Sequence, residues 1–178
     1  LGLTKKIGLE PLTEDARKFV EETYVLPLED SKTKIRVDLI FSLAERMSLD
    51  ITTPCAVCFL RLKVAEHELK NAPHLKVKVE KDIGMEIKLS HKTKHILEVL
   101  YHDVGIEFIE KKVQKSLKGL KAVTYYGCYL VRPPDITKFD DPENPIIMDK
   151  IMEALGVEVI DWSCKVDCCG GGLSLTAP

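Results

Sequence analysis

The 178-residue sequence lacks a long apolar run, and it lacks a marked excess of charge of either sign. A membrane-spanning helix needs about 20 consecutive apolar residues, so we expect no membrane span. The formal net charge is −2, and we therefore expect no binding to nucleic acid through an overall field. The first ten residues hold two lysines and no apolar core, so we expect no secretory signal in them.

Cysteine is absent from the first 54 residues, but six cysteines follow further along the chain. Small secreted proteins spread their cysteines to form disulfides. Here most of them lie in or beside tight pairs, which indicates metal or redox chemistry in a reducing compartment, and we expect a cytoplasmic protein. Disulfides in the isolated protein remain an alternative. The six are Cys55, Cys58, Cys128, Cys164, Cys168 and Cys169.

Strand and helix patterns alternate along the chain. This order predicts an α/β fold with a parallel sheet flanked by helices. Cysteines follow each expected strand, at the sheet edge where ligands bind in such folds. Because the strand-then-cysteine pattern recurs, we also expect two related, partial halves. The expected strands are residues 49–53, 120–126 and 157–162; the expected helices are 13–24, 35–47, 55–70, 95–102 and 106–117, with another starting at residues 144–145.

The cysteine spacings suggest two groups of metal ligands. Cys55 and Cys58 are expected at a helix start, where the helix dipole favours thiolates that share one ion or cluster. A thioredoxin-like dithiol is the main rival interpretation of this pair. Cys128 follows a strand, and the adjacent Cys168 and Cys169 suit two bridged metals, with a glycine run that gives the backbone room. The rival there is an ordinary glycine-rich turn.

The remaining candidates are more simply explained by structural or surface roles. Cys164 is expected to be a structural cysteine. His95 is the best ligand candidate among the histidines, although a capping or surface role is the safer interpretation for each histidine. Arg132 is expected to form a surface salt bridge, with an anionic substrate as the alternative. Three aromatic residues beside the cysteines are expected to pack in the core or to rim a substrate pocket: Tyr125, Tyr126 and Trp162.

Five motifs, at residues 53–63, 94–100, 125–134, 139–145 and 168–170, resemble the B subunit of CoB–CoM heterodisulfide reductase. They occur in the order of that family and extend the resemblance over roughly residues 35–176. The family carries two copies of a cysteine-rich domain, and five cysteines of each copy bind a noncubane [4Fe–4S] cluster; related copies bind zinc. The resemblance implies an oxidoreductase subunit that reduces a small disulfide and works with other iron–sulfur subunits.

The resemblance also assigns the cysteines. It implies that Cys55 and Cys58 close the first copy, whereas Cys128, Cys168 and Cys169 open the second. The expected domains are therefore residues 1–92, a remnant of the first copy, and residues 93–178, a second copy without its C-terminal part. The ligands missing from both copies have three explanations: truncation at both ends, which we favour, segments absent from the sequence, or ligands from another chain. The alternative function is a zinc-binding or electron-transfer subunit of a succinate, lactate or glycolate dehydrogenase-type complex.

Overall fold

The computed structural model describes residues 32–170 of the chain. The helix expected at residues 13–24 lies outside these residues. The chain divides into two units after Arg36. All side chains discussed below belong to the second unit, which starts at Val37.

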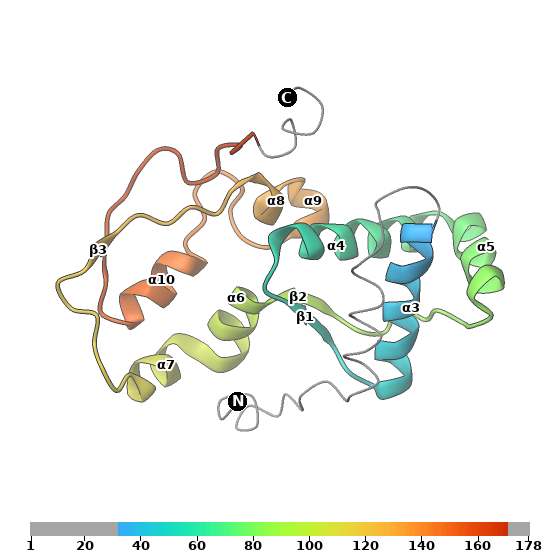
Figure 1. Ribbon diagram of the computed structural model, residues 1–178, viewed down its shortest axis with the longest axis horizontal. Helices are drawn as coiled ribbons and strands as arrows, with labels where there is room; N and C mark the ends of the chain where they lie inside the picture. The colour runs from blue at the N-terminus through green and yellow to red at the C-terminus, as the bar shows by residue number, and fades with distance from the viewer. Residues whose placement is uncertain (1–31, 171–178) are drawn as a thin grey trace. The chain divides into compact units, whose positions relative to one another are not determined.

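The first half of this unit is built around a short parallel strand pair. Strand β1 pairs with β2 in parallel, with Ile51 opposite Thr93 and Thr53 opposite His95. Helix α4 contacts both strands (Figure 1). The elements are α3 (Lys32–Met47), β1 (Ile51–Thr53), α4 (Ala56–Asn71), α5 (Pro73–Ile83) and β2 (Thr93–His95).

A hydrophobic cluster holds these helices together. Its buried members come from α3, α4, α5 and the segment before β2, and they are Phe41, Leu62, Leu69, Val79 and Ile87. The cluster forms because apolar residues recur on one face of α3 and one face of α4.

The second half starts directly after β2 with three consecutive helical segments. Strands β3 and β4 then form a second parallel pair, with Lys121 opposite Glu158 and Ala122 opposite Val159. The elements are α6 (Ile96–Glu98), the π-helical segment η1 (Val99–Gly105), α7 (Ile106–Lys112), β3 (Lys121–Ala122), α8 (Cys128–Val131), α9 (Pro134–Thr137), α10 (Ile147–Ala154) and β4 (Glu158–Val159).

A second hydrophobic cluster fills this half, and α4 contributes Phe59 to it. Helix α4 contacts both α8 and α9, so the start of α4 lies against the segment that carries Cys128. The buried members of the cluster are Phe59, Tyr126, Leu130, Val131, Phe139, Ile147, Ile151 and Val166.

The structure confirms the mixed helix and parallel-strand character that the sequence predicts. The expectation of one sheet is wrong within residues 32–170, where the strands form two separate pairs. The strand expected at residues 120–126 is regular only over Lys121–Ala122, because the amide of Tyr126 bonds to the Lys165 carbonyl in a turn instead of to a strand. Strand β2 was not expected.

Cys55 follows the end of β1, as expected. Cys128 instead starts α8 at a distance from β3, and Cys168 and Cys169 lie in an irregular segment well beyond β4. A sheet edge is therefore not what brings the later cysteines together. The structural relation of the two halves stays a prediction.

Candidate metal centre

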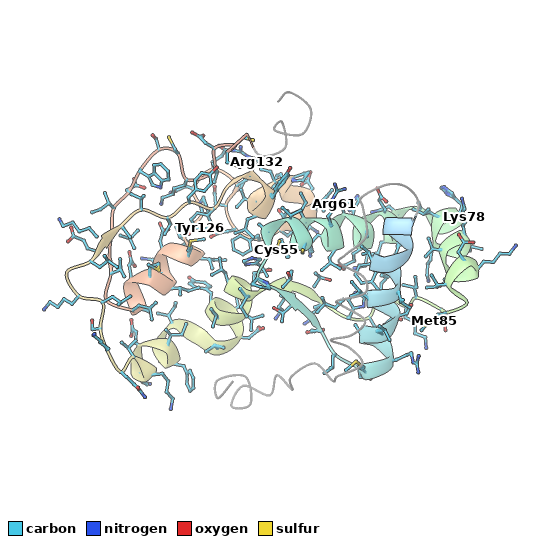
Figure 2. The ribbon with its side chains drawn as sticks, viewed as in Figure 1. Cys55, Arg61, Lys78, Met85, Tyr126 and Arg132 are labelled. Carbon is cyan, nitrogen blue, oxygen red and sulfur yellow. The ribbon has the colours of Figure 1, made fainter. Side chains whose placement is uncertain are left out.

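Cys55 and Cys58 lie together at the N-terminal end of α4, where Figure 2 labels Cys55. Cys55 is the N-cap residue; its amide donates to the Thr53 hydroxyl at 3.2 Å, and its carbonyl accepts from the amide of Phe59 at 2.9 Å. The Cys58 thiol hydrogen-bonds to the Cys55 sulfur. Cys55 is exposed and Cys58 is half-buried, so this pair is open to solvent on one side.

The helix start favours the charged form of Cys55. A hydrogen bond from the backbone amide of Cys58 lowers the pKa of Cys55, and the Cys58 thiol adds to this effect. Partial burial acts in the opposite direction but is weaker. Since thiolates and not thiols bind metals, the pair has the chemistry that a soft metal needs.

The structure also brings Cys128 to Cys168. The two thiols lie within hydrogen-bonding contact, and Cys169 is close enough to act on Cys128 electrostatically. Burial raises the pKa of the Cys128 thiol, and the contact with Cys168 raises it further. The amide of Gly170 donates to the Cys168 sulfur at 3.4 Å.

The thiols suit a thiophilic metal, but they do not form a complete binding site. Among residues 32–170, no three His, Cys, Asp or Glu side chains are arranged to hold a metal ion. The structure therefore offers two thiol pairs, one at Cys55 and Cys58 and one at Cys128 and Cys168, with Cys169 beside the second. Their roles as ligands stay predictions.

Tyr125 forms the rim of the second thiol group. Its hydroxyl donates to the carbonyl of Asp167 at 2.5 Å, which closes the turn next to Cys168. The ring lies over Gly127, where a Cβ would come within 3.5 Å of it. Desolvation and the nearby thiols of Cys169 and Cys128 raise the pKa of Tyr125, so its phenol keeps the proton.

A buried polar network lies behind these thiols. Lys165 donates to Asp149 at 2.8 Å, and Asp149 also accepts from the hydroxyls of Thr124 and Tyr126. Burial acts to raise the pKa of Asp149, but the bonds from Lys165, Thr124 and Tyr126 outweigh it and hold this pKa below its usual range. Burial raises the pKa of Tyr126 above its usual range.

Sequence reasoning missed this network. Asp149 lies in the first turn of α10 next to the exposed Lys150, and Lys165 lies between the expected strand and Cys168. The only available signal was a charged residue beside apolar ones in each segment. A lone charge of this kind is usually solvated, which is why it carries little weight in a sequence.

Two other candidates have structural roles. The Nδ1 atom of His95 accepts from the amide of Leu97 at 3.3 Å, and the His95 ring also donates to the Pro54 carbonyl. His95 therefore caps α6, which is the capping role that the sequence favours over metal ligation. Arg132 forms the expected ion pair with Glu143 at 2.7 Å.

Cys164 and Trp162 also lie near the thiols. The Cys164 thiol is half-buried and contacts the Ser163 hydroxyl at 3.7 Å. The indole of Trp162 donates to the Thr124 carbonyl at 2.6 Å, and its ring lies 6.1 Å from that of Tyr125. Trp162 thus fixes the segment that leads to Cys128.

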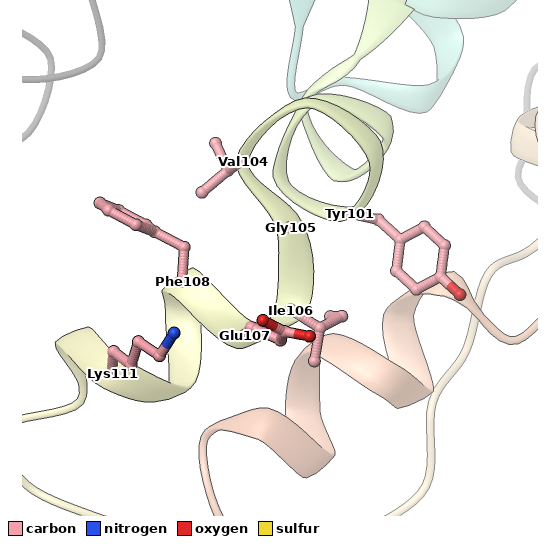
Figure 3. A pocket seen from close by; sticks show the side chains of 7 residues that line it. All are labelled: Tyr101, Val104, Gly105, Ile106, Glu107, Phe108 and Lys111. Carbon is pink, nitrogen blue, oxygen red and sulfur yellow. The ribbon is translucent and has the colours of Figure 1, made fainter.

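A surface pocket lies where η1 meets α7, and its lining contains no cysteine (Figure 3). Its volume is about 550 Å³. The lining residues are Tyr101, Val104, Gly105, Ile106, Glu107, Phe108 and Lys111. A binding site would need several converging polar groups, and the lining offers two charged side chains, both from α7.

The segment that contains the second thiol group matches a known protein family. Residues 122–177 match the family model described as "Cysteine-rich domain". This match covers Cys128, Cys168 and Cys169, so the segment that bears the second thiol group is similar to this domain. Within residues 32–170, no helix is both long and apolar enough to cross a membrane.

Over part of its length, the chain is similar to B subunits of heterodisulfide reductases. It is 38% identical over 133 residues to the B subunit of the ferredoxin/F420H2-dependent CoB–CoM heterodisulfide reductase of Methanosarcina acetivorans. It is 36% identical to the B subunit of the ferredoxin:CoB–CoM heterodisulfide reductase of Methanosarcina mazei. Each match covers 73% of this chain but 44% of the relative, so the chain spans less than half the length of these proteins.

A relative with a different role matches almost as much of the chain. The 8-methylmenaquinol:fumarate reductase membrane anchor subunit of Wolinella succinogenes is 32% identical over 130 residues. This match covers 72% of the chain and 45% of the relative. The shared sequence therefore occurs in subunits of more than one kind of reductase.

Proposed function

We propose that the chain is part of a redox subunit that holds an iron–sulfur cluster and reduces a small disulfide. The observation that carries this proposal is the contact between Cys128 and Cys168 inside the segment that matches the cysteine-rich domain. Residues far apart in sequence supply these two thiols, and a soft metal is the ligand that such a convergence suits best. The identity to the B subunits of two heterodisulfide reductases supports the disulfide as the substrate class.

The proposed ligands are Cys128, Cys168 and Cys169 for one centre, and Cys55 and Cys58 for another. We propose a noncubane [4Fe–4S] cluster, because the five motifs resemble a family whose cysteine-rich domains bind one. When bound, the cluster would pass electrons from the partner iron–sulfur subunits to the disulfide. The proposed partners are other iron–sulfur subunits, and the proposed compartment is the reducing cytoplasm, since clustered thiols would otherwise oxidise.

The protein's own residues prepare the site for this role. The amide of Gly170 donates to the Cys168 sulfur at 3.4 Å and so helps to orient this side chain. The Tyr125 ring lies over Gly127, next to Cys128, and its hydroxyl bonds to the Asp167 carbonyl, next to Cys168. At the start of α4, the backbone amide of Cys58 favours the thiolate of Cys55.

We also propose that residues 1–92 and 93–178 are the two cysteine-rich domains, each incomplete. The two hydrophobic clusters support this boundary, because one draws on residues before position 92 and the other mainly on residues after it. Phe59 crosses the boundary and packs in the second cluster. The two domains would thus share the start of α4.

Metal reconstitution tests the proposed function. The full chain would be incubated anaerobically with ferrous iron and sulfide, and bound iron and acid-labile sulfide would be counted alongside the visible spectrum. We expect iron and sulfide in the parent, and a large loss of both in Cys128→Ser, Cys168→Ser and Cys169→Ser. Cys164→Ser is the matched control and should keep the metal. Equal metal content in all five proteins would overturn the ligand assignment.

A second candidate is an electron-transfer or zinc-binding subunit of a dehydrogenase or fumarate reductase-type complex. The identity to a fumarate reductase subunit favours it, and three thiols with one outside ligand would satisfy tetrahedral zinc. A colourless protein with stoichiometric zinc and no sulfide would support this candidate against the first. A protein that binds neither metal would contradict both.

A further inference from the structure

The two segments that carry Cys128 and Cys168 meet at the backbone of Lys165. The Lys165 carbonyl accepts from the amide of Tyr126 at 2.8 Å and from the amide of Gly127 at 3.2 Å. Cys128 follows Gly127 directly, and Cys168 lies three residues after Lys165, just beyond the turn at residues 163–166. The position of Lys165 therefore influences how far apart the two thiols lie.

The side chain of Lys165 is itself held in place by a buried carboxylate. Its ammonium group lies 2.8 Å from Asp149 and 3.2 Å from Asp161. The Lys165 side chain is 7% exposed and that of Asp149 is 10% exposed, whereas that of Asp161 is 90% exposed. An exposed carboxylate contributes little, so Asp149 is the partner that makes the burial of this ammonium group tolerable.

The other oxygen of Asp149 binds the segment before Cys128. It accepts from the Tyr126 hydroxyl at 3.0 Å and from the Thr124 hydroxyl. The Tyr126 hydroxyl in turn accepts from the amides of Met148 and Asp149 at 2.8 and 3.1 Å. One carboxylate on α10 thus holds both cysteine-bearing segments, each through a separate oxygen.

We propose that Asp149 is a positioning residue that sets the separation of the Cys128 and Cys168 thiols through Lys165 and Tyr126. Asp149 touches neither sulfur. Its effect on chemistry comes from the distance at which it holds the two thiols. The importance of this distance for a cluster rests on the proposed function, but the distance can be tested without any metal.

Disulfide formation in the metal-free full chain reports the distance. With diamide as the oxidant, the two thiols lose two hydrogens and form one S–S bond, and diamide takes up both hydrogens to become the hydrazine. A Cys164→Ser, Cys169→Ser background leaves Cys168 as the single thiol of its segment. Quenched samples would be digested, and the Cys128–Cys168 and Cys55–Cys58 disulfides would be quantified by mass spectrometry over time.

In that background, Asp149→Asn should slow formation of the Cys128–Cys168 disulfide by about tenfold or more, because reactions between held groups depend steeply on geometry. The Cys55–Cys58 disulfide should form at the parent rate. The matched control is Glu153→Gln, which removes an exposed carboxylate from the same helix, where it pairs with Lys150 at 2.8 Å. This control should leave both rates unchanged.

Equal Cys128–Cys168 rates in Asp149→Asn and Glu153→Gln would overturn the proposal, and so would equal slowing of both disulfides. If circular dichroism shows that Asp149→Asn has lost its fold, the Tyr126→Phe variant tests the proposal instead. This variant removes only the hydroxyl that bonds to Asp149. It should slow the same disulfide selectively, and an unchanged rate would refute the proposal. A parent that binds no iron would refute the proposed function and leave this result standing.

Discussion

His95 and Glu98 cap helix α6 reciprocally: the amide of His95 donates to the Glu98 carboxylate at 2.7 Å, and the His95 ring accepts from the amide of Leu97 at 3.3 Å. Both amides belong to the first turn, where a helix cannot satisfy them itself. His95 also lies opposite Thr53 in the strand pair. The cap therefore joins the strand before Cys55 to the start of the second half.

Replacement of Glu98 by Ala should lower the free energy of unfolding by about 1 kcal/mol, the usual cost of a lost cap. Glu98→Gln keeps the acceptor oxygen. Because burial raises the pKa of Glu98, a neutral side chain suits this position, and the Gln variant should stay close to the parent. Urea denaturation would measure the free energy of unfolding of the parent and both variants. Equal losses in Ala and Gln would show that the hydrogen bond to His95 does not stabilise the helix.

Acid should destabilise the protein through His91. Burial lowers the pKa of His91, although the carboxylates of Glu66 and Glu45 act to raise it and Lys70 acts to lower it. Neither ring nitrogen has a hydrogen-bond partner within the described residues, and the ring stacks on Phe41 at 4.7 Å. The folded state therefore holds the neutral form.

The sign of the effect follows from proton binding. Above a pH of about 6.5, His91 is neutral in both states and stability does not change. As the pH falls below that value, the unfolded state takes up the proton first, so the free energy of unfolding decreases. His91→Gln should reduce this loss between about pH 7 and pH 5. A part of it should remain, because burial also lowers the pKa of His95.

Measuring the free energy of unfolding by denaturation at several pH values would test this prediction. His74→Gln is the control, because His74 is exposed on α5, and it should retain the parent's loss of stability in acid. The interpretation is wrong if His91→Gln and the parent lose stability equally as the pH falls.

The amphipathic helices could be predicted from the sequence because their information is local. Apolar residues at helical spacing place α3 and α4 within a few residues of their observed bounds. Strand β2 could not be predicted in this way. Its three residues, Thr93–His95, carry no alternation of apolar and polar side chains, and pairing with β1 alone makes them a strand.

The candidate site likewise contains one contact that could be predicted from the sequence and one that could not. The contact of Cys55 with Cys58 follows from their spacing at one helix start, which the sequence shows directly. The contact of Cys128 with Cys168 depends on hydrogen bonds from Tyr126 and Gly127 to the Lys165 carbonyl. No local pattern encodes those bonds, and the sheet edge that we expected to bring the cysteines together does not do so.

Gly156 ends α10 and should not tolerate a side chain. Its φ is +92°, and a Cβ would overlap the Ser116 hydroxyl and come within 3.4 Å of the Leu117 amide. The left-handed backbone alone costs about 1–2 kcal/mol for a residue with a Cβ, so Gly156→Ala should cost more than this. Thermal denaturation would measure the loss.

Gly84 provides the comparison for this prediction. Its φ is +67°, but a Cβ there would meet nothing within 4 Å, so Gly84→Ala should cost about 1–2 kcal/mol from the backbone alone. Adding Ser116→Gly to Gly156→Ala should recover a part of the loss. Equal costs at the two glycines would mean that the contact with Ser116 is relieved by a small shift.

Phe59 connects the first cysteine pair to the second hydrophobic cluster. It is fully buried, follows Cys58 directly, and its ring packs edge-on against His95 at 5.7 Å and Phe139 at 6.1 Å. Phe59→Ala should lower the free energy of unfolding by about 3–5 kcal/mol, because it leaves a cavity between α4 and the second half. Phe59→Leu should cost less, since it fills a part of that space.

Phe108→Ala is the matched control, because Phe108 is 48% exposed on α7. Its loss should stay below about 1 kcal/mol, which is typical of surface substitutions that remove little packing. Urea denaturation followed separately by Trp162 fluorescence and by circular dichroism would measure each variant. Trp162 bonds to the segment that leads into the second cluster, and Phe59 packs in that cluster, so both probes should shift together in Phe59→Ala. If only the unfolding midpoint measured by circular dichroism shifts, α4 unfolds independently of the second half. Phe59 would then not join the two halves into one core.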